Sequence, residues 1–430
     1  MRGRDKKGFR DFRNRIEKVD AIKFIHLSDI HIGFETYGKI NTVTGRNTRL
    51  EDVLNSLDFI FDTAIKESVE LVLISGDVFH RENPHPTEET EFAKRIARLV
   101  RDRDTNVVIV LGNHDYPTSF GKAAAVEIFP ALNLDKVLIA RKPDVHTVKL
   151  KNKVIQIACL PWARKSTLLS KDEYKSLSPE EVRVEIENKL IHIVRNLIAK
   201  IDNSLPAVFV GHVALREAEF SGTEMGSLFS SDPSIPKAEL LQPVLNYVAL
   251  GHIHKFQNLN QGHTPPIVYS GSIERIDFSE EKEKKGFVIG EIFKGPRGGW
   301  ECKFEFRETP ARKFLTIELS ERDKDIETII KNIGQEDIKD SVIKIKYRVS
   351  RLNQKLDEKR IRDILSDAYM IKIEKIVEDT EKRIRSQISK TMDIMEALEK
   401  YIGTKPGIKH IAEDMKKYAR KLIEELENQA

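Results

Sequence analysis

The chain has 430 residues, of which 40% are apolar and 33% are charged, and its formal net charge is +4. This length allows two or three domains, and the composition is that of a globular protein, which excludes a disordered or fibrous chain. Only two cysteines are present, which excludes a disulfide framework and a thiolate zinc site, and no apolar run could cross a membrane. We therefore expect a cytoplasmic protein that has no membrane partner.

The first domain is expected to follow a basic tail over residues 1–20, which lacks the apolar segment of a secretory signal. Strands and helices then alternate. Runs of apolar and β-branched residues predict strands at 21–28, 71–75, 107–111, 154–160, 207–210 and 247–250. Apolar residues at helical spacing predict helices at 50–66, 87–102 and 179–201.

From residue 266 the pattern changes to strands that have no helices between them. These strands are predicted at 267–270, 286–293 and 300–307. The first half alternates strand with helix, and the second half adds antiparallel strands. This pattern favours an α/β fold class. The simplest architecture over residues 21–308 is two stacked mixed β-sheets flanked by helices.

Two smaller segments follow this domain. Residues 309–378 predict a compact α/β unit, with strands at 314–319, 342–349 and 370–377 and helices at 326–333 and 357–367. Residues 379–430 have a helical pattern throughout, and the Gly- and Pro-containing stretch 403–407 divides it into two helices. Each helix has an apolar stripe, which either packs on the body of the protein or binds a helix of a partner.

Polar side chains follow five of the predicted strands, at the carboxyl ends where open α/β sheets bind ligands. Glycine at most of these turns lets the neighbouring loops approach one another. A single histidine in such a place is more often structural, but five strand ends in order favour a metal centre. Mixed nitrogen and oxygen ligands suit two divalent ions and favour manganese, iron or zinc over magnesium. The residues are Asp29, His31, Asp77, Asn113, His114, His212, His252 and His254.

These motifs resemble the full signature of the calcineurin-like metallophosphoesterases. They read Asp29-x-His31, Gly76-Asp77, Gly112-Asn113-His114-Asp115, Gly211-His212 and Gly251-His252-x-His254. The resemblance implies one metal held by Asp29, His31, Asp77 and His254, and a second held by Asp77, Asn113, His212 and His252. Asp77 would bridge the two ions. The resemblance also implies that His114 acts on the leaving oxygen or the transition state, and that Asp115 orients His114.

Two further stretches are similar to the SbcD-type nucleases, also called the MRE-eleven type. They are Gly76-Asp-Val-Phe-His80, with prolines at 84 and 86, and Tyr269-Ser-Gly-Ser-Ile-Glu-Arg275-Ile-Asp-Phe278 with Lys285-Gly-Phe287. His80 would be a second active-site histidine near the DNA end; the alternative is a loop histidine without a role. The resemblance implies a manganese-dependent DNA exonuclease and endonuclease that processes double-strand breaks.

The accessory segments carry expectations of their own. Strand 342–349 alternates, so that Lys344, Lys346 and Arg348 share one face and, with Arg275, could follow a phosphate backbone. The alternative is an ordinary solvated face. The resemblance implies that residues 309–378 bind DNA and that residues 379–430 bind the coiled coil of an SMC-like ATPase of the SbcC type. It also implies a homodimer through helices 50–66 and 88–99.

Two other functions remain open at this point. A phosphodiesterase that acts on small nucleotides would use the same metal centre, but it would need neither the small α/β unit nor the terminal helices. A non-catalytic scaffold on the same fold is the alternative from another class of protein. A scaffold has no need of the complete ligand set, so the nuclease is the function that the sequence favours.

Overall fold

The computed structural model describes residues 21–117, 121–164, 168, 177–221, 232–321, 323, 326–350, 356–377, 395, 398–399, 402 and 412–427. The chain divides into two compact units, Met1–Phe314 and Leu315–Ala430. The predicted basic tail, the breaker at 403–407 and most of the first predicted C-terminal helix lie outside the described residues. Among the described residues, no helix is both long and apolar enough to cross a membrane.

The first unit contains two six-stranded mixed sheets, which confirms the predicted α/β architecture. The first sheet has the order β14-β13-β1-β2-β3-β4 and the second has the order β11-β12-β10-β7-β6-β5. Strands of the first sheet are β1 (Ile22–Leu27), β2 (Leu71–Ile74), β3 (Asn106–Val110), β4 (Val137–Ala140), β13 (Gly286–Lys294) and β14 (Trp300–Glu308). Strands of the second are β5 (Asp144–Leu150), β6 (Lys153–Leu160), β7 (Ala207–His212), β10 (Tyr247–Gly251), β11 (Gln257–Asn258) and β12 (Ile267–Tyr269).

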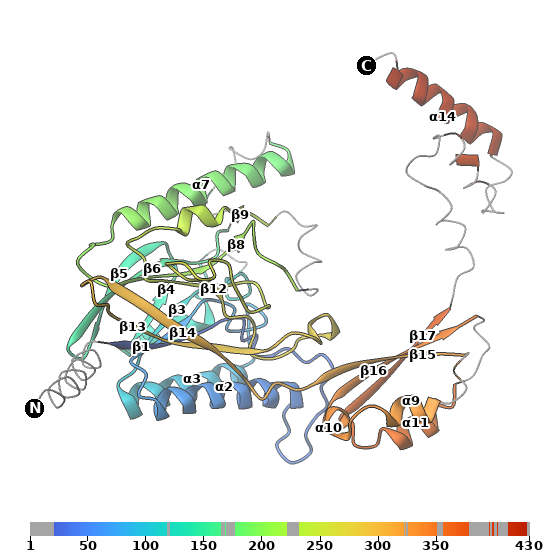
Figure 1. Cartoon of the computed structure of the whole chain (residues 1–430), viewed down its shortest axis with the longest axis horizontal. Helices are drawn as coiled ribbons and strands as arrows, with labels where there is room; N and C mark the ends of the chain where they lie inside the picture. Colours follow the sequence, from blue (N-terminus) through green and yellow to red (C-terminus); the bar gives the residue numbers. More distant parts are fainter. Residues whose placement is uncertain are drawn as a thin grey trace, which may run out of the picture. The chain divides into compact units, whose positions relative to one another are not determined.

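Helices cover the outer faces of both sheets (Figure 1). Helices α2 (Thr48–Lys66) and α3 (Pro86–Arg103) pack on the first sheet, and α7 (Pro179–Ala199) packs on the second. Each begins where the sequence provides a cap. Asn47 accepts the backbone N–H of Arg49, and Ser178 forms a capping box with Glu181 ahead of α7. A third apolar core, which includes Val110 and Tyr247, fills the space between the sheets.

Smaller elements connect these layers. They are η1 (Ala125–Glu127), α4 (Ile128–Ala131), the pair β8 (Ala214–Leu215) and β9 (Ser234–Ile235), η2 (Lys237–Leu240) and η3 (Phe278–Glu280). Strands β4 and β5 were not predicted, and the structure gives a reason in the case of β5. It forms the edge of the second sheet, and most of its side chains are exposed or half-buried, so its sequence lacks a continuous apolar run.

The second unit contains a three-stranded sheet of β15 (Phe314–Ser320), β16 (Val342–Val349) and β17 (Met370–Val377), in that order. Its helices are α9 (Ile326–Lys331), α10 (Gln335–Ile338) and α11 (Glu358–Ile364). The predicted alternation of β16 is confirmed: Ile343, Ile345, Tyr347 and Val349 are buried, whereas Lys344, Lys346 and Arg348 are not. The C-terminal helix α14 spans Ala412–Glu427.

Candidate metal centre

The predicted site residues follow the carboxyl ends of β1, β2, β3, β7 and β10. Strands β1, β2 and β3 are parallel neighbours in the first sheet, and β7 and β10 are parallel neighbours in the second. Parallel strands bring their carboxyl ends to the same edge, and stacking of the two sheets brings both edges together. Asp29, His31 and Asp77 have positive φ angles, as does His252, so these turns are unusually tight for residues other than glycine.

Asp77 lies between two groups of nitrogen and oxygen ligands. Its Oδ2 is 3.7 Å from Nε2 of His31 and 3.5 Å from Nε2 of His212. On one side, Nε2 of His31 is 3.1 Å from Nε2 of His254. On the other side, Nε2 of His212 is 2.9 Å from Oδ1 of Asn113. This arrangement has the form that one carboxylate shared by two metal ions requires.

Asp29 and His252 complete the two groups. The carboxylate of Asp29 accepts the backbone N–H of His252, over 3.1 and 3.2 Å to its two oxygens, and the hydroxyl of Ser28 over 2.5 Å. Asp29, His31 and His254 form one set of close ligand atoms, and Asp29, Asp77 and His212 form another. All seven predicted ligands except Asn113 are buried.

Burial and close opposite charges shift the pKa values of these groups. Burial raises the pKa of Asp29 and lowers that of His31 well below its ordinary value. Burial also lowers the pKa of His252 to about 3. Burial by itself would raise the pKa of Asp77 and lower that of His212, but the attraction between their opposite charges outweighs burial. It holds the pKa of Asp77 well below its ordinary range and raises that of His212 to about 9.

The polar atoms of this site fit a pair of divalent metal ions. Nε2 of His252 is buried and has no hydrogen-bond partner among the described residues. A buried nitrogen without a partner costs free energy unless a ligand satisfies it. Carboxylates, an amide oxygen and imidazoles are ligands suited to manganese, iron or zinc. The residues therefore fit the group that the sequence pattern implies.

His114 and His80 lie beside these ligands, on the loops that follow β3 and β2. The ring of His114 stacks on that of His80, with centroids 5.6 Å apart, and meets the ring of His31 edge-on. Nδ1 of His114 is 2.8 Å from the backbone oxygen of His80. A carbonyl oxygen only accepts, so Nδ1 carries the hydrogen of this bond.

The structure assigns Asp115 a different task from the expected one. Its carboxylate accepts the backbone N–H groups of Val78, Phe79 and Gly112 over 3.0, 3.2 and 2.9 Å. It therefore joins the loops that carry Asp77 and Asn113, whereas the carbonyl of His80 orients the ring of His114. Sequence reasoning missed that carbonyl because a backbone atom leaves no signal in residue identity.

Two other contacts were also missed. Nδ1 of His212 is 2.7 Å from the backbone oxygen of Ser75, and Nδ1 of His254 is 2.8 Å from Oε1 of Glu280. Glu280 lies between the quoted stretches 269–278 and 285–287, so a search for buried acids in that region could have found it. The indole ring of Trp162 lies 4.9 Å from the ring of His252.

The residues predicted to bind DNA belong to both units of the chain: Arg275 to the first, and Lys344, Lys346 and Arg348 to the second. Arg275 is half-buried, and its guanidinium donates to the backbone oxygens of Arg312 and Glu283 over 3.1 and 2.7 Å. These bonds give Arg275 a structural task on the loop after β12. Lys344 and Lys346 are half-buried, and Arg348 is exposed on β16, with an ion pair of 3.1 Å to Glu318.

Comparison with known proteins connects this geometry to a family. The family model described as "Calcineurin-like phosphoesterase" matches residues 22–256. The DNA double-strand break repair protein Mre11 of Archaeoglobus fulgidus is 24% identical over 382 residues, which cover 84% of this chain and 76% of that protein. The protein of the same name from Saccharolobus solfataricus is 27% identical over 267 residues, covering 62% and 57%.

A bacterial relative is similar to the same part of the chain. It is the SbcD component of the nuclease SbcCD from Bacillus subtilis, which is 24% identical over 290 residues. The match covers 65% of this chain and 68% of that protein. The chain thus spans between 57% and 76% of the length of these three relatives.

Proposed function

The chain belongs to the family of calcineurin-like phosphoesterases, and from this premise we propose that it is a dinuclear-metal nuclease acting on DNA double-strand breaks. The names of its relatives, a break-repair protein and a component of a nuclease, support this substrate. The activity would include exonuclease and endonuclease cleavage of phosphodiester bonds.

One observation carries the proposal: Asp77 lies between two groups of buried ligands that come from five strand ends. Oδ2 of Asp77 is 3.7 Å from His31 and 3.5 Å from His212, which supports its role as the shared ligand. Asp29 and His254 would complete the first metal site. Asn113 and His252 would complete the second. Mn²⁺ suits this mixture of nitrogen and oxygen ligands, and we propose it as the metal.

The remaining residues would act on the substrate. When bound, the two metals would polarise the phosphodiester and stabilise charge on the attacking and leaving oxygens. His114 is held through Nδ1 by the His80 carbonyl; in its imidazolium form it would also carry a proton on Nε2 and would donate that proton to the leaving oxygen. Burial and the neighbouring His114 lower the pKa of His80, and His80 would donate a hydrogen bond to the DNA end.

Residues 309–378 and 379–430 would supply the DNA contacts and the partner. Lys344, Lys346 and Arg348 lie on the less buried face of β16 and would contact phosphates. Helix α14 is amphipathic, and Tyr418 on it is 65% exposed, which supports binding of a coiled coil from an SMC-like ATPase.

We also propose a homodimer, for which fewer residues of α2 are available than the sequence suggested. Leu54, Leu57, Ile60 and Phe61 of α2 are buried in the core of the first unit and therefore cannot line an interface. Phe59 on the same helix is 43% exposed and could contact a second copy. Light scattering of the wild-type protein and of Phe59→Glu would test this, because the charge should shift a dimer toward monomer.

The function is tested by comparing two substrates. Purified full-length protein is stripped of metal, supplied with Mn²⁺ and incubated with end-labelled linear duplex DNA or with a chromogenic phosphodiester. We expect Mn²⁺-dependent cleavage of the DNA, including release of nucleotides from its ends. A variant with His114→Ala serves as the control for a contaminating nuclease.

Each alternative function predicts a different result. A phosphodiesterase for small nucleotides would cleave the chromogenic diester and leave the DNA intact. A scaffold would cleave neither substrate, even with both metals bound. Either result would overturn the proposed nuclease.

A further inference from the structure

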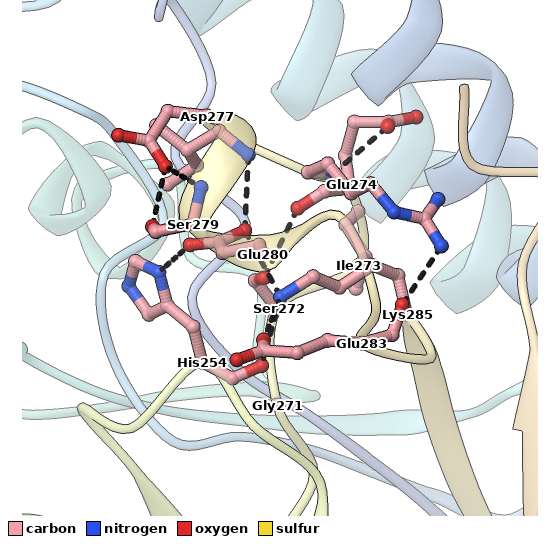
Figure 2. A network of polar contacts seen from close by, with 12 residues as sticks. His254, Gly271, Ser272, Ile273, Glu274, Asp277, Ser279, Glu280, Glu283 and Lys285 are labelled. Atoms are coloured by element: carbon pink, nitrogen blue, oxygen red, sulfur yellow. Dashed lines mark hydrogen bonds and ion pairs between the residues drawn. The ribbon is translucent and has the colours of Figure 1, made fainter. Parts of the chain in front are cut away.

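His254 is held at both ends by one buried network (Figure 2). Its Nδ1 lies 2.8 Å from Oε1 of Glu280, and its backbone oxygen accepts a hydrogen bond of 3.1 Å from Nζ of Lys285. Nζ of Lys285 is also 2.9 Å from Oε2 of Glu280. The three residues thus form a closed ring of contacts that begins and ends on His254. The side chains of Glu280 and Lys285 are fully buried.

The backbone around His254 is fixed as well. The N–H of Ser272 donates to the oxygen of His254 over 3.0 Å. Gly271 has a φ of +74°, and a Cβ atom there would lie 2.7 Å from that same oxygen. Glycine therefore lets the loop after β12 approach the metal-ligand loop closely enough for Ser272 to bond.

The position of Glu280 is set independently of His254. Glu280 ends the turn η3, and its Oε2 accepts the backbone N–H of Ile276 over 3.0 Å. Lys285 contributes three donors and reaches three acceptors, the third being Oε2 of Glu283 over 2.8 Å. Because the carboxylate of Glu280 is fixed by these other contacts, it would set the orientation of the His254 imidazole.

We propose that Glu280 and Lys285 are positioning residues that fix the tautomer and ring orientation of His254 for metal binding. An ionised carboxylate only accepts hydrogen bonds, so Nδ1 of His254 carries the hydrogen and the lone pair of Nε2 faces the site. Nε2 indeed lies 3.1 Å from Nε2 of His31, the neighbouring ligand.

This partner differs from those of the other site histidines. Nδ1 of His212 and of His114 are each paired with a backbone oxygen, from Ser75 and His80. A carboxylate forms a stronger, charge-assisted bond and makes the imidazole a better electron donor to a metal. His254, in the proposed first metal site, therefore has a stronger hydrogen-bond partner than His212 has in the second.

This inference rests on the proposed role of His254 as a metal ligand, and its test uses Mn²⁺ alone with no nucleic acid. The metal-free full chain is titrated with Mn²⁺ by calorimetry, as wild type and as Glu280→Gln. We expect two ions to bind to the wild type. In the variant, one affinity should fall by about 10- to 100-fold while the other is kept, as is typical when the partner of a metal-ligating histidine is removed.

A matched control separates positioning from general stability. Glu283→Gln removes a second carboxylate from Lys285 but leaves the carboxylate of Glu280 beside Nδ1 of His254. We expect this variant to bind both ions as the wild type does. Proton NMR of the metal-free proteins tests the hydrogen bond of His254 directly, without metal. A downfield Nδ1–H resonance from His254 should be present in wild type and Glu283→Gln, and shifted or lost in Glu280→Gln.

The outcomes distinguish this inference from the proposed function. Two ions bound with equal affinity by wild type and Glu280→Gln would overturn the inference alone. A wild type that binds no Mn²⁺ would overturn both. If Glu280→Gln does not fold, Glu280→Asp is titrated instead, because it keeps the charge beside Lys285 but withdraws the carboxylate from His254. A wild-type affinity in that variant would overturn the inference equally.

Discussion

The backbone N–H of His114 donates a hydrogen bond of 2.9 Å to Oδ1 of Asp77. The residue that we expect to bridge the metals therefore also holds the loop that carries the proposed acid. The other oxygen of Asp77, Oδ2, is the one that lies close to His31 and His212. The two oxygens thus have separable tasks, and suitable substitutions can test them one at a time.

Asp77→Asn should lose both metals while keeping the loop in place. The amide oxygen can still accept from His114, but the negative charge that a shared ligand supplies is gone. We expect metal content, measured by elemental analysis after dialysis, to fall from about two ions per chain toward none. Asp58→Asn, on α2 outside the centre, is the matched control. Normal occupancy in the Asp77 variant would show that Asp77 does not bridge.

His114→Ala should keep both metals and lose cleavage. Nδ1 of His114 is paired with the His80 carbonyl, and in the proposed assignment His114 acts on the substrate and is not a metal ligand. Removal of one transition-state donor costs on the order of 10² to 10³ in rate. The measurement pairs elemental analysis with the cleavage rate at saturating Mn²⁺. Metal content well below that of the wild type would contradict this role for His114.

Gly76→Ala adds only one methyl group but should weaken metal binding at the candidate centre. Gly76 has a φ of +96°, and a Cβ atom would lie 2.1 Å from Nδ1 of His212. That overlap would displace His212 from the Ser75 oxygen, so we expect weakened Mn²⁺ binding and a lower melting temperature. Gly262→Ala is the matched control, because it has a φ of +77° with no atom within 4 Å of the new Cβ. It should show backbone strain alone, roughly 1 kcal/mol, with normal metal binding.

The sequence predicted those parts of the fold and site that depend on side-chain pattern. The buried run of β3 and the polar residues after it were visible because a parallel strand is apolar throughout and is followed, at its carboxyl end, by the polar residues of a ligand site. The alternation of β16 was visible because successive side chains of a strand point to opposite faces, of which one is buried here. Each of these features is local, so residue order alone is enough to reveal it.

What the sequence could not predict depends on contacts between distant segments. The edge strand β5 has an exposed, polar sequence that only pairing with β6 makes into a strand. Asp115 follows His114 directly, yet its carboxylate binds backbone N–H groups of Val78 and Phe79 from another loop. The same applies to Glu280 and His254, which only the folded chain brings within 2.8 Å.

The stability of the metal-free protein should fall in acid because of His26. Nδ1 and Nε2 of His26 are 3.0 and 2.9 Å from the hydroxyl oxygens of Tyr247 and Ser75, so the ring connects the two sheets. Burial lowers the pKa of His26 from 6.5 to about 3. Between these values the unfolded chain binds a proton that the folded chain does not. The free energy of unfolding therefore decreases as pH falls, by up to about 1.4 kcal/mol per pH unit.

His26→Gln removes this titration while keeping a side chain that can bond to both hydroxyls. We expect the wild type to lose unfolding free energy relative to the variant as pH falls from 6.5 to about 3. Urea unfolding of both metal-free proteins at several pH values measures the two slopes. His263→Gln, at an exposed loop position, is the control and should keep the wild-type slope. Parallel slopes for wild type and His26→Gln would refute the prediction.

The last prediction concerns the residues after Val377, which we propose to bind the ATPase. Among the described residues, the apolar cluster of the second unit reaches Ile373, and Ile402 is the buried apolar residue after Val377. A large apolar side chain contributes roughly 1.5–3 kcal/mol when it is buried. A terminal segment that binds a partner instead of packing in the core of the first unit should therefore add little to the stability of that unit.

Deletion after Val377 should separate the two explanations for the apolar stripes of this segment. If the stripes bind a partner, the truncated protein should keep its melting temperature and its Mn²⁺-dependent cleavage of single-stranded DNA. It should also fail to capture the coiled-coil ATPase in a pull-down that succeeds with the full chain. The substitutions Leu422→Glu and Leu426→Glu on α14 in the full chain should abolish capture in the same way. A melting temperature lowered by many degrees, or retained capture, would instead assign the stripes to the core of this chain.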